Sequence, residues 1–301
     1  MEAEQRTALF LAIAANVIWG TTFLASAWTL KTWDPITASF LRFAAASVLL
    51  LPFQLKNGVP ISKLTSTERR GLFWVGITSY GALYPLQLAG LMYIPTSVSA
   101  VIMLTSPLVL VLLASVLLSE TLSANKIAGV VLGGAGGVLL LLRDGEQIQS
   151  NAALSYQTLG YAATFLAAVS LALSAIFTRR ISKSVPIVTI TFWPMLLGAL
   201  LMAPFSLLEK RSIMSSFSLS DKEGRQSILA LIFLASIASV LCFIAWNKAL
   251  SLSEARSLAS TMHIKTPVAI TLGVLVAGEP LNTTLALSAV LVILGVGLSQ
   301  R

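Results

Sequence analysis

Long apolar runs recur along the whole sequence, and they constrain the fold more than any other feature. Each run has the length that a helix needs to cross a bilayer, ~17–25 residues, and is bounded by charge, Pro or Gly. The ten runs lie at 8–30, 36–55, 70–89, 97–118, 125–142, 159–178, 187–208, 226–247, 257–277 and 283–300. Because a helix satisfies its own backbone polar groups in lipid, we predict an all-α integral membrane protein with ten transmembrane helices.

The composition agrees with a chain that lies mostly in lipid. Of its 301 residues, 56% are hydrophobic and 11% are charged, whereas a soluble domain has roughly 25% charged residues. The net charge of +8 comes mainly from basic residues between apolar runs, so it does not indicate nucleic-acid binding. Glu2, Glu4 and Arg6 do not form the basic start of a signal peptide, so we expect the first run to be retained as a helix. The single cysteine, Cys242, allows no intramolecular disulfide.

The distribution of basic residues predicts the orientation. With the N-terminus in the cytoplasm, twelve Lys and Arg residues fall on the cytoplasmic side and six on the other side. Basic residues favour the cytoplasmic side of membrane proteins. We therefore predict that both termini are cytoplasmic.

A phrase in the first half of the chain recurs in the second half. Thr105-Ser-Pro107 leads through an apolar run to Glu120, and Lys265-Thr-Pro267 leads through another to Glu279. The glutamates are 159 residues apart, whereas the prolines miss this offset by one residue. Five runs in each half is an odd number, so the second copy enters the membrane from the opposite side. We predict two inverted five-helix repeats, residues 1–148 and 149–301, around a site at the midplane.

Lys265 is a basic residue near the middle of the ninth run, with Thr261 one turn earlier on the same helix face. A central Lys costs at least ~2.5–3.5 kcal/mol on insertion scales, so it normally faces a protein interior or a water-filled cavity. Lys265 could hold the carboxylate of an amino acid or of another organic anion. The alternative is a structural lysine that bonds to carbonyls freed near Pro267.

Two further ionisable residues lie in apolar runs. Arg42 lies near the outer end of the second run, and pairing with Asp34 or with helix-end carbonyls is the favoured interpretation. His263 is the only histidine and a candidate for proton coupling, although a lone histidine is more often a packing residue. It is two residues from Lys265, about 200° around a helix, so we expect the two side chains to diverge. Facilitated exchange without a proton relay is an equally open alternative.

Aromatic and amide side chains complete the candidate site. Tyr80, Tyr84 and Gln87 share a face of the third run, where they can line a pore or belong to an interfacial belt. Asn16 and Trp19 share a face of the first run, and Trp246 lies near the inner end of the eighth, where a belt role is an alternative. The predicted substrate-binding residues are Lys265, His263, Thr261, Tyr80, Tyr84, Gln87, Asn16, Trp19 and Trp246.

Prolines and glycines give a second set of predictions. Pro107 and Pro267 each remove a backbone donor, so we predict hinges there, with packing kinks as the alternative. Gly129, Gly133 and Gly137 have the spacing of a close helix contact, within the chain or in a dimer. Glu120 and Glu279 are expected to anchor helix ends or loops, without binding substrate. The sequence has no phosphate-binding loop and no metal-ligand motif, so we predict no catalytic residue, cofactor or metal.

Short motifs, in order along the ten runs, carry a resemblance to a known family. The chain resembles the ten-helix branch of the drug/metabolite transporter superfamily, with two EamA-type repeats. The matching motifs are Asn16-Val-Ile-Trp19-Gly20-Thr-Thr-Phe23, Leu41-Arg42-Phe43, Ser106-Pro107, Ser119-Glu120-Thr-Leu122, Thr266-Pro267 and Gly278-Glu279-Pro-Leu281. The second half has no counterpart of Trp19-Gly20, which departs from strict symmetry.

The resemblance implies a secondary transporter of the bacterial inner membrane, with runs 1, 3, 4, 6, 8 and 9 around a central cavity. We expect it to export amino acids or related compounds by alternating access. Its partners would be a small-molecule substrate and the bilayer, without nucleic acid, and it would be a monomer or a weak homodimer. The alternatives are a facilitator of another drug or metabolite, an intramembrane lipid-modifying enzyme, and a channel or scaffold that transports nothing.

Overall fold

The computed structural model describes residues 2–117, 119, 121–145, 151–211, 221–252, 258 and 260–300. All the regular elements in these residues are helices. Glu120 and the predicted repeat boundary between residues 148 and 149 lie outside the described residues. The boundary stays a prediction.

The described helices account for every predicted span. In chain order they are α1 (Glu2–Thr29), α2 (Pro35–Asn57), η1 (Ile61–Lys63), α3 (Ser66–Val75), η2 (Gly76–Ala82), α4 (Leu83–Leu91), α5 (Thr96–Met103), α6 (Ser106–Leu117), α7 (Ala124–Gly145), α8 (Asn151–Ile181), α9 (Ile187–Ser206), α10 (Lys222–Phe233), η3 (Leu234–Leu241), α11 (Cys242–Leu252), η4 (Ser260–Ile264), α13 (Lys265–Leu275) and α14 (Thr283–Ser299). In the described part of the chain, six helical stretches are long and apolar enough to cross a membrane, and two shorter apolar helices match the fifth and tenth spans.

Four of the spans are interrupted by irregular helix or by a turn. The third contains the π-helical segment η2, and the eighth contains the π-helical segment η3. The fourth is broken by a turn at Leu104 and Thr105, and the ninth changes from a 3-10 helix to an α-helix between Ile264 and Lys265. Segments η2 and η3 begin 158 residues apart and end 159 apart, which matches the repeat offset. Both halves therefore deviate from α-helix at corresponding places.

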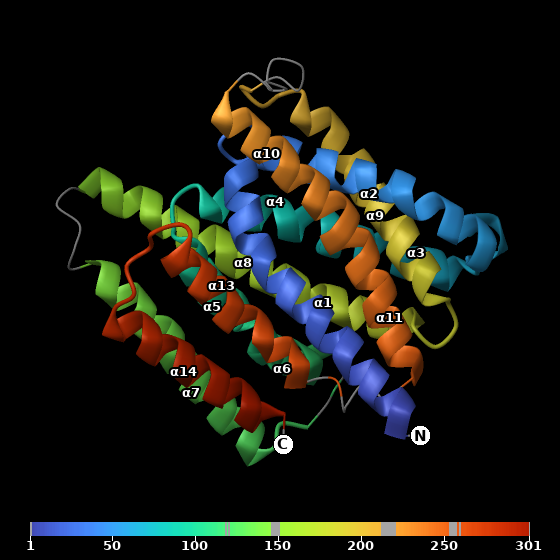
Figure 1. Ribbon diagram of the computed structural model, residues 1–301. Helices are drawn as coiled ribbons and strands as arrows, with labels where there is room; N and C mark the ends of the chain where they lie inside the picture. The colour runs from blue at the N-terminus through green and yellow to red at the C-terminus, as the bar shows by residue number, and fades with distance from the viewer. Residues whose placement is uncertain are drawn as a thin grey trace.

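The helix contacts agree with two inverted repeats. Helix α2 packs on α9, α5 on α13, and α7 on α14, so helices two, four and five of the first repeat each contact their counterparts. Two further contacts correspond to each other between the repeats. The first helix of the first repeat, α1, packs on the third of the second repeat, α10 and α11, and the first helix of the second repeat, α8, packs on the third of the first repeat, α3 and α4. Figure 1 shows α7 and α14 as a pair beside the rest of the bundle, with both termini at one end of the molecule.

Glycines allow α7 and α14 to approach closely. A Cβ atom on Gly129 would lie 2.5 Å from the carbonyl oxygen of Gly295, and one on Gly295 would lie 2.5 Å from the amide nitrogen of Gly133. A Cβ on Gly137 would meet nothing within 4 Å. The predicted packing role is thus confirmed for Gly129 and Gly133, within one chain, whereas Gly137 lies outside this contact.

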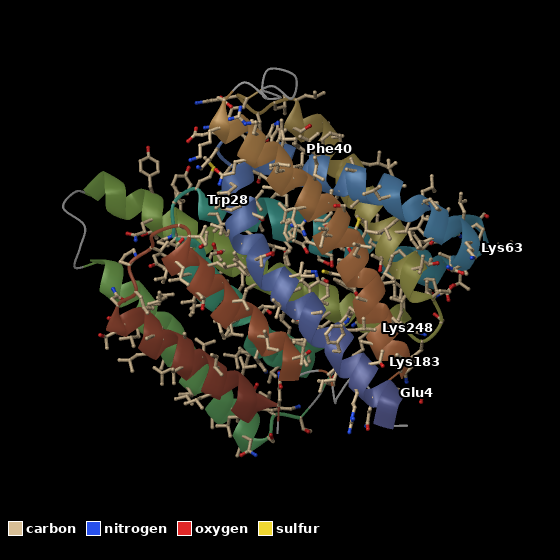
Figure 2. The ribbon with its side chains drawn as sticks, viewed as in Figure 1. Glu4, Trp28, Phe40, Lys63, Lys183 and Lys248 are labelled. Atoms are coloured by element: carbon tan, nitrogen blue, oxygen red, sulfur yellow. The ribbon has the colours of Figure 1, made fainter. Side chains whose placement is uncertain are left out.

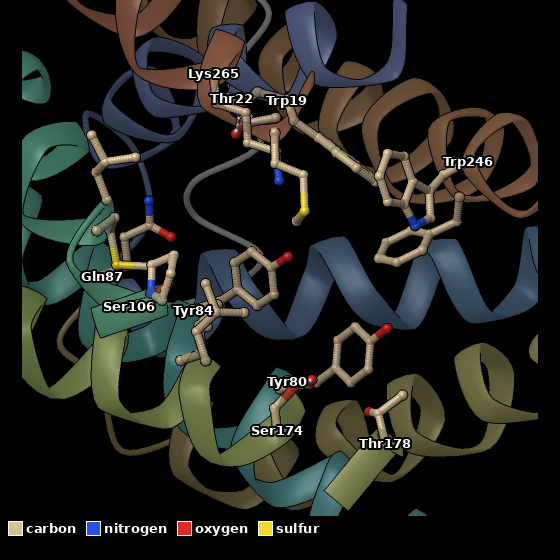
Figure 3. Close-up of a pocket in the computed structure, with 18 of the residues that line it drawn as sticks. Trp19, Thr22, Tyr80, Tyr84, Gln87, Ser106, Ser174, Thr178, Trp246 and Lys265 are labelled. Carbon is tan, nitrogen blue, oxygen red and sulfur yellow. Dashed lines mark hydrogen bonds between the residues drawn. The ribbon is translucent and has the colours of Figure 1, made fainter. Parts of the chain in front are cut away.

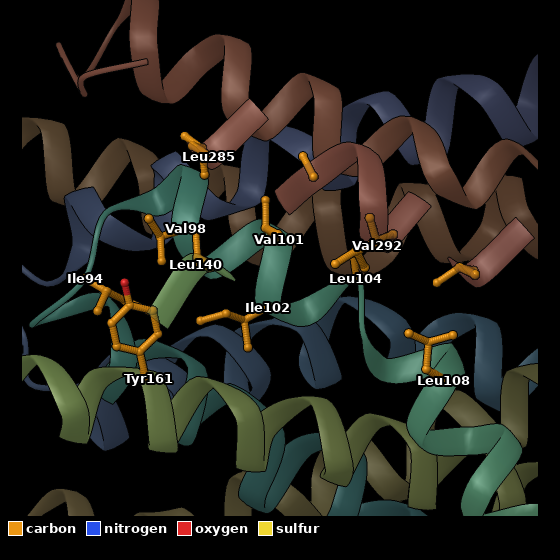
Figure 4. Close-up of a cluster of buried hydrophobic side chains, with 12 residues drawn as sticks. Ile94, Val98, Val101, Ile102, Leu104, Leu108, Leu140, Tyr161, Leu285 and Val292 are labelled. Atoms are coloured by element: carbon orange, nitrogen blue, oxygen red, sulfur yellow. The ribbon is translucent and has the colours of Figure 1, made fainter. Parts of the chain in front are cut away.

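A cluster of apolar side chains joins this pair to the bundle. Val98 and Val101 of α5 pack with Leu140 of α7, Tyr161 of α8 and Val292 of α14 (Figure 4). Val101, Leu140 and Val292 are fully buried. Large apolar side chains such as Leu55, Val116 and Leu208 remain exposed on the outside, as a lipid-facing surface requires. The cluster therefore joins the pair of α7 and α14 to the helices that surround a central cavity.

Candidate functional site

A cavity of about 520 Å³ lies among the helices, a volume within the range of small-molecule sites. At one end its lining residues include Gln87 and Ala100, which are buried. At the other end they include Ser182, Ile187 and Gln300, which are exposed. Gln300 adjoins the C-terminus, so the cavity opens toward the end of the molecule where both termini lie.

Lys265 lies on the cavity wall at the first residue of α13. Its Nζ is 4.5 Å from the centroid of the Trp19 ring, which is a cation–π distance. The side chain is half-buried, and its ammonium makes no hydrogen bond or ion pair with any described residue. Lys265 is therefore a cation available to an anion that enters the cavity.

Trp19 forms the wall beside Lys265. Its Nε1 donates to the carbonyl oxygen of Ala238 at 2.9 Å, and its ring contacts Phe243 at 5.4 Å and Trp246 at 5.8 Å between centroids. Ala238 belongs to the π-helical η3, so this irregular segment fixes the Trp19 ring. Trp246 also lines the cavity and is part of this aromatic wall.

Tyr80, Tyr84 and Gln87 all line the cavity, and Tyr80 and Tyr84 face Lys265 and Trp19 across it (Figure 3). Tyr80 is 5% exposed, which argues against a lipid-facing belt position. The two rings stack at 6.3 Å, and both contact Phe43. These rings give the cavity flat apolar walls with polar tips.

Arg42 corrects an expectation from the sequence, because it does not pair with Asp34. Asp34 faces Arg211, whose Nε is 3.7 Å from Asp34 Oδ1. Arg42 is 4% exposed and lines the cavity, where Nε donates to Ser239 Oγ at 3.0 Å. Its guanidinium lies 4.6 Å from the Tyr84 ring centroid. Among the described residues, the cavity is thus lined by one arginine, from α2, and one lysine, from α13.

Asn16 and Thr261 lie away from the cavity lining. The Asn16 side-chain amide donates to Thr261 Oγ1 at 3.0 Å and to the Ala12 carbonyl oxygen at 2.8 Å. Thr261 in turn donates to the Leu258 carbonyl oxygen at 2.7 Å. Both residues are buried, and their hydrogen bond joins α1 to η4. The proposed substrate site does not include them.

His263 lines the same cavity as Lys265, although an α-helix would place the two side chains on different faces. The 3-10 segment η4 ends just before Lys265, and its tighter turn sets residues two apart at about 120° from each other, instead of about 160° in an α-helix. The buried Nδ1 of His263 has no hydrogen-bond partner among the described residues. A proton-coupling role for His263 stays a prediction.

The prolines follow the helix breaks. Pro107 is the second residue of α6 and Pro267 the third residue of α13. A proline in a first turn removes a donor that has no partner within the helix. Pro107 lines the cavity. The helix breaks thus lie just before each proline, at Leu104 and Thr105 and at Ile264 and Lys265, and the hinge roles of Pro107 and Pro267 stay predictions.

The sequence prediction missed hydroxyl groups on the cavity wall. Ser174 and Thr178 of α8 line it, and the Ser174 hydroxyl pairs with that of Ser79 at 2.5 Å. Their spacing of four residues in an apolar run is a signal that could have found them. The six spans expected around the cavity, 1, 3, 4, 6, 8 and 9, all contribute to its lining. Helices α2 and α9 contribute as well, through Arg42 and Thr191.

The end of the cavity away from the termini, lined by buried residues, is its closed end, and polar contacts join the two halves near it. Glu279, after α13, accepts hydrogen bonds from the backbone N–H groups of Thr96 and Ser97 at the start of α5, at 2.6 and 2.9 Å. Glu209, after α9, accepts from those of Ile36 and Thr37 at 2.9 and 2.6 Å. The expected anchoring role is confirmed for Glu279.

Comparison with known proteins gives the family. A model of the EamA-like transporter family matches residues 6–142 and again residues 158–300. A solved crystal structure with 22% identity shares the fold, with a TM-score of 0.63 over 97% of this chain and 96% of that chain.

Curated relatives match over nearly the whole chain. An uncharacterized transporter of Archaeoglobus fulgidus is 27% identical, over 87% of this chain and 86% of that protein. A probable amino-acid metabolite efflux pump of Salmonella typhimurium is 25% identical, over 95% and 92%. The uncharacterized inner membrane transporter YedA of Escherichia coli is 24% identical, over 94% and 87%. Because two successive family matches cover most of its length, the chain belongs to the EamA-like transporter family and is a membrane transporter, not an enzyme.

Proposed function

We propose that this transporter exports small carboxylate-bearing metabolites, amino acids first among them, by alternating access through the cavity. The observation that carries the proposal is Lys265, whose ammonium has no counter-ion among the described residues and faces a cavity of substrate size. An ammonium binds a carboxylate through charge-assisted hydrogen bonds. Amino acids also supply a side chain that can pack on the aromatic walls at Trp19 and Tyr84.

Amino acids are the first class to test for a second reason. The Salmonella typhimurium relative is named a probable amino-acid metabolite efflux pump and aligns with 95% of this chain. Because that relative is only 25% identical, its name alone does not give the substrate of this chain, and other carboxylates should be tested beside amino acids.

Alternating access needs two gates and elements that bend. The two interrupted spans at Leu104 and Lys265, and the two π-helical segments η2 and η3, occur at corresponding places in the two repeats. Inverted repeats can exchange conformations, so that the end now closed by Glu279 opens while the other end closes. This supports a carrier with a moving site over a channel or a scaffold.

The orientation is part of the proposal. The basic residues Lys63, Lys183 and Lys248 lie along the same edge of the molecule as Glu4, near the N-terminus (Figure 2). This distribution supports cytoplasmic termini and a cavity open to the cytoplasm, the side from which an exporter loads. We place the protein in a bacterial inner membrane, as the name of the Escherichia coli relative suggests, as a monomer or weak homodimer.

Labelling from outside tests the orientation. In a Cys242→Ala background, a cysteine replacing exposed Lys210 should react with a membrane-impermeant maleimide in intact spheroplasts. A cysteine replacing exposed Lys63 should react only after the membrane is permeabilised. The reverse pattern would overturn the proposed orientation and place the open end of the cavity outside.

Counterflow in proteoliposomes tests the function. Vesicles loaded with an unlabelled amino acid should transiently accumulate the same labelled amino acid, and protein-free vesicles should not. The panel should include neutral and acidic amino acids and simple organic acids. If no carboxylate-bearing solute shows counterflow while the protein remains folded, the proposed function is wrong.

A further inference from the structure

Arg42 and Lys265 occupy one cavity, and together they carry more positive charge than one carboxylate balances. We propose that the preferred solutes bear two separate carboxylates: small dicarboxylates, with acidic amino acids among them. This inference rests on the proposed function and narrows its substrate class.

Arg42 has donors to spare inside the cavity. Its guanidinium has five N–H donors, and the one on Nε is used by Ser239. The two terminal nitrogens make no hydrogen bond with any described residue. The Phe43 and Tyr84 rings lie 5.0 and 4.6 Å from Cζ and hold the planar group in place. Such a fixed fork is suited to a bidentate carboxylate.

Among the described residues, no Asp or Glu lines the cavity. The nearby acids at the closed end are already engaged, since Asp34 faces Arg211 and Glu279 accepts from Thr96 and Ser97. A cation withdrawn from water without an anionic partner is costly, because its lost hydration is not fully replaced. A solute with two carboxylates gives each cation an anionic partner, whereas a solute with one carboxylate leaves one cation without such a partner.

The placement of the cations favours two separate anionic groups over one doubly charged group. Lys265 stands beside Trp19 on one wall, and Arg42 contacts Tyr84, which Figure 3 shows on the opposite wall. A phosphate monoester concentrates its charge on a single group and meets one wall at a time. A dicarboxylate can present one carboxylate to each wall, and its hydrocarbon segment then lies between aromatic faces.

Isosteric pairs test the inference on the unmodified protein. Counterflow of glutamate should exceed that of glutamine by about tenfold or more, and succinate should exceed succinamate in the same way. Each pair differs in one carboxylate and hardly in size. Equal counterflow within the pairs would overturn the dicarboxylate assignment and leave the proposed function standing. Stronger competition with glutamate counterflow by glycerol 3-phosphate than by succinate would also overturn the dicarboxylate assignment. No counterflow of any carboxylate would overturn both.

Variants of Arg42 locate the second carboxylate. Arg42→Gln should reduce the glutamate-to-glutamine ratio about tenfold, and Arg42→Lys should retain only part of it, because the charge remains but the planar fork is lost. Ser239→Ala removes the partner of Nε and keeps the charge, so it is the matched control for the loss of that hydrogen bond. An Arg42→Gln protein that elutes as a folded species and keeps the wild-type ratio would overturn the role of Arg42. If Arg42→Gln does not fold, the glutamate-to-glutamine ratio of Arg42→Lys tests the role of Arg42. The isosteric pairs on the wild-type protein still test the dicarboxylate assignment.

Discussion

Counterflow of a carboxylate-bearing solute should fall by about 10- to 100-fold when Lys265 is replaced with alanine. A hydrogen bond to a charged group contributes about 1.5–3 kcal/mol, and about 1.4 kcal/mol corresponds to a factor of ten. Lys265 makes no hydrogen bond or ion pair with any described residue, so its removal should cost binding with little cost to the fold. The measurement is initial counterflow in proteoliposomes at equal protein content.

Two variants control for indirect effects. Lys265→Arg keeps a cation over the Trp19 ring and should retain part of the activity. Lys63→Ala removes an exposed lysine outside the cavity and should leave counterflow unchanged. Wild-type counterflow by Lys265→Ala would remove Lys265 from the site, and with it the main support for the proposed function.

Local patterns in the sequence predict much of the fold, because lipid imposes length and apolarity on each span. The ten spans follow from these constraints, and the repeated phrase around Glu120 and Glu279 indicates the inverted halves. Helical spacing also predicts the cavity face formed by Tyr80, Tyr84 and Gln87. Lys265 is identified because a charge inside an apolar run needs a special environment.

Contacts between distant segments could not be predicted in this way. Asn16 meets Thr261 across 245 residues, and Asp34 meets Arg211 across 177, and no local pattern specifies either partner. Without Asp34 as its partner, Arg42 points into the cavity, so the favoured interpretation of Arg42 from the sequence is wrong. The π-helical segments could not be located from the sequence either, since neither η2 nor η3 contains a proline to mark the irregularity.

The π-helical segments explain how an apolar bundle positions a polar site. Segment η2 carries Ser79 and Tyr80, and segment η3 carries Ala238 and Ser239, which bond to Trp19 and Arg42. A π-helical turn leaves backbone groups out of the regular α-helical pattern, and such turns are frequent at functional sites. Here the Ala238 carbonyl accepts from the Trp19 indole, so the irregular backbone directly orients a cavity wall. The same segments are the places where the third and eighth spans can bend.

Replacing Glu279 with alanine should lower the apparent Tm in detergent by roughly 5 °C or more. The Glu279 carboxylate accepts three hydrogen bonds from Thr96 and Ser97, two from backbone N–H groups and one from the Thr96 hydroxyl. Thr96 and Ser97 are buried, and each buried donor left without a partner costs about 1–3 kcal/mol. The negative charge of the carboxylate also stabilises α5, because it lies at the N-terminal end of that helix, where the helix dipole is positive.

Glu68 is the matched control, because it caps α3 through a similar pair of contacts with Thr65 in an exposed position. Glu68→Ala should lower the apparent Tm by much less, since water replaces the lost contacts. Glu279→Ala should also open the closed end, so a cysteine at Gln87, in a Cys242→Ala background, should react faster with a maleimide applied from that side. Equal Tm losses in the two variants, with unchanged labelling at Gln87, would show that Glu279 is an ordinary cap. A large loss with faster labelling makes Glu279 the contact that seals the cavity between the two repeats.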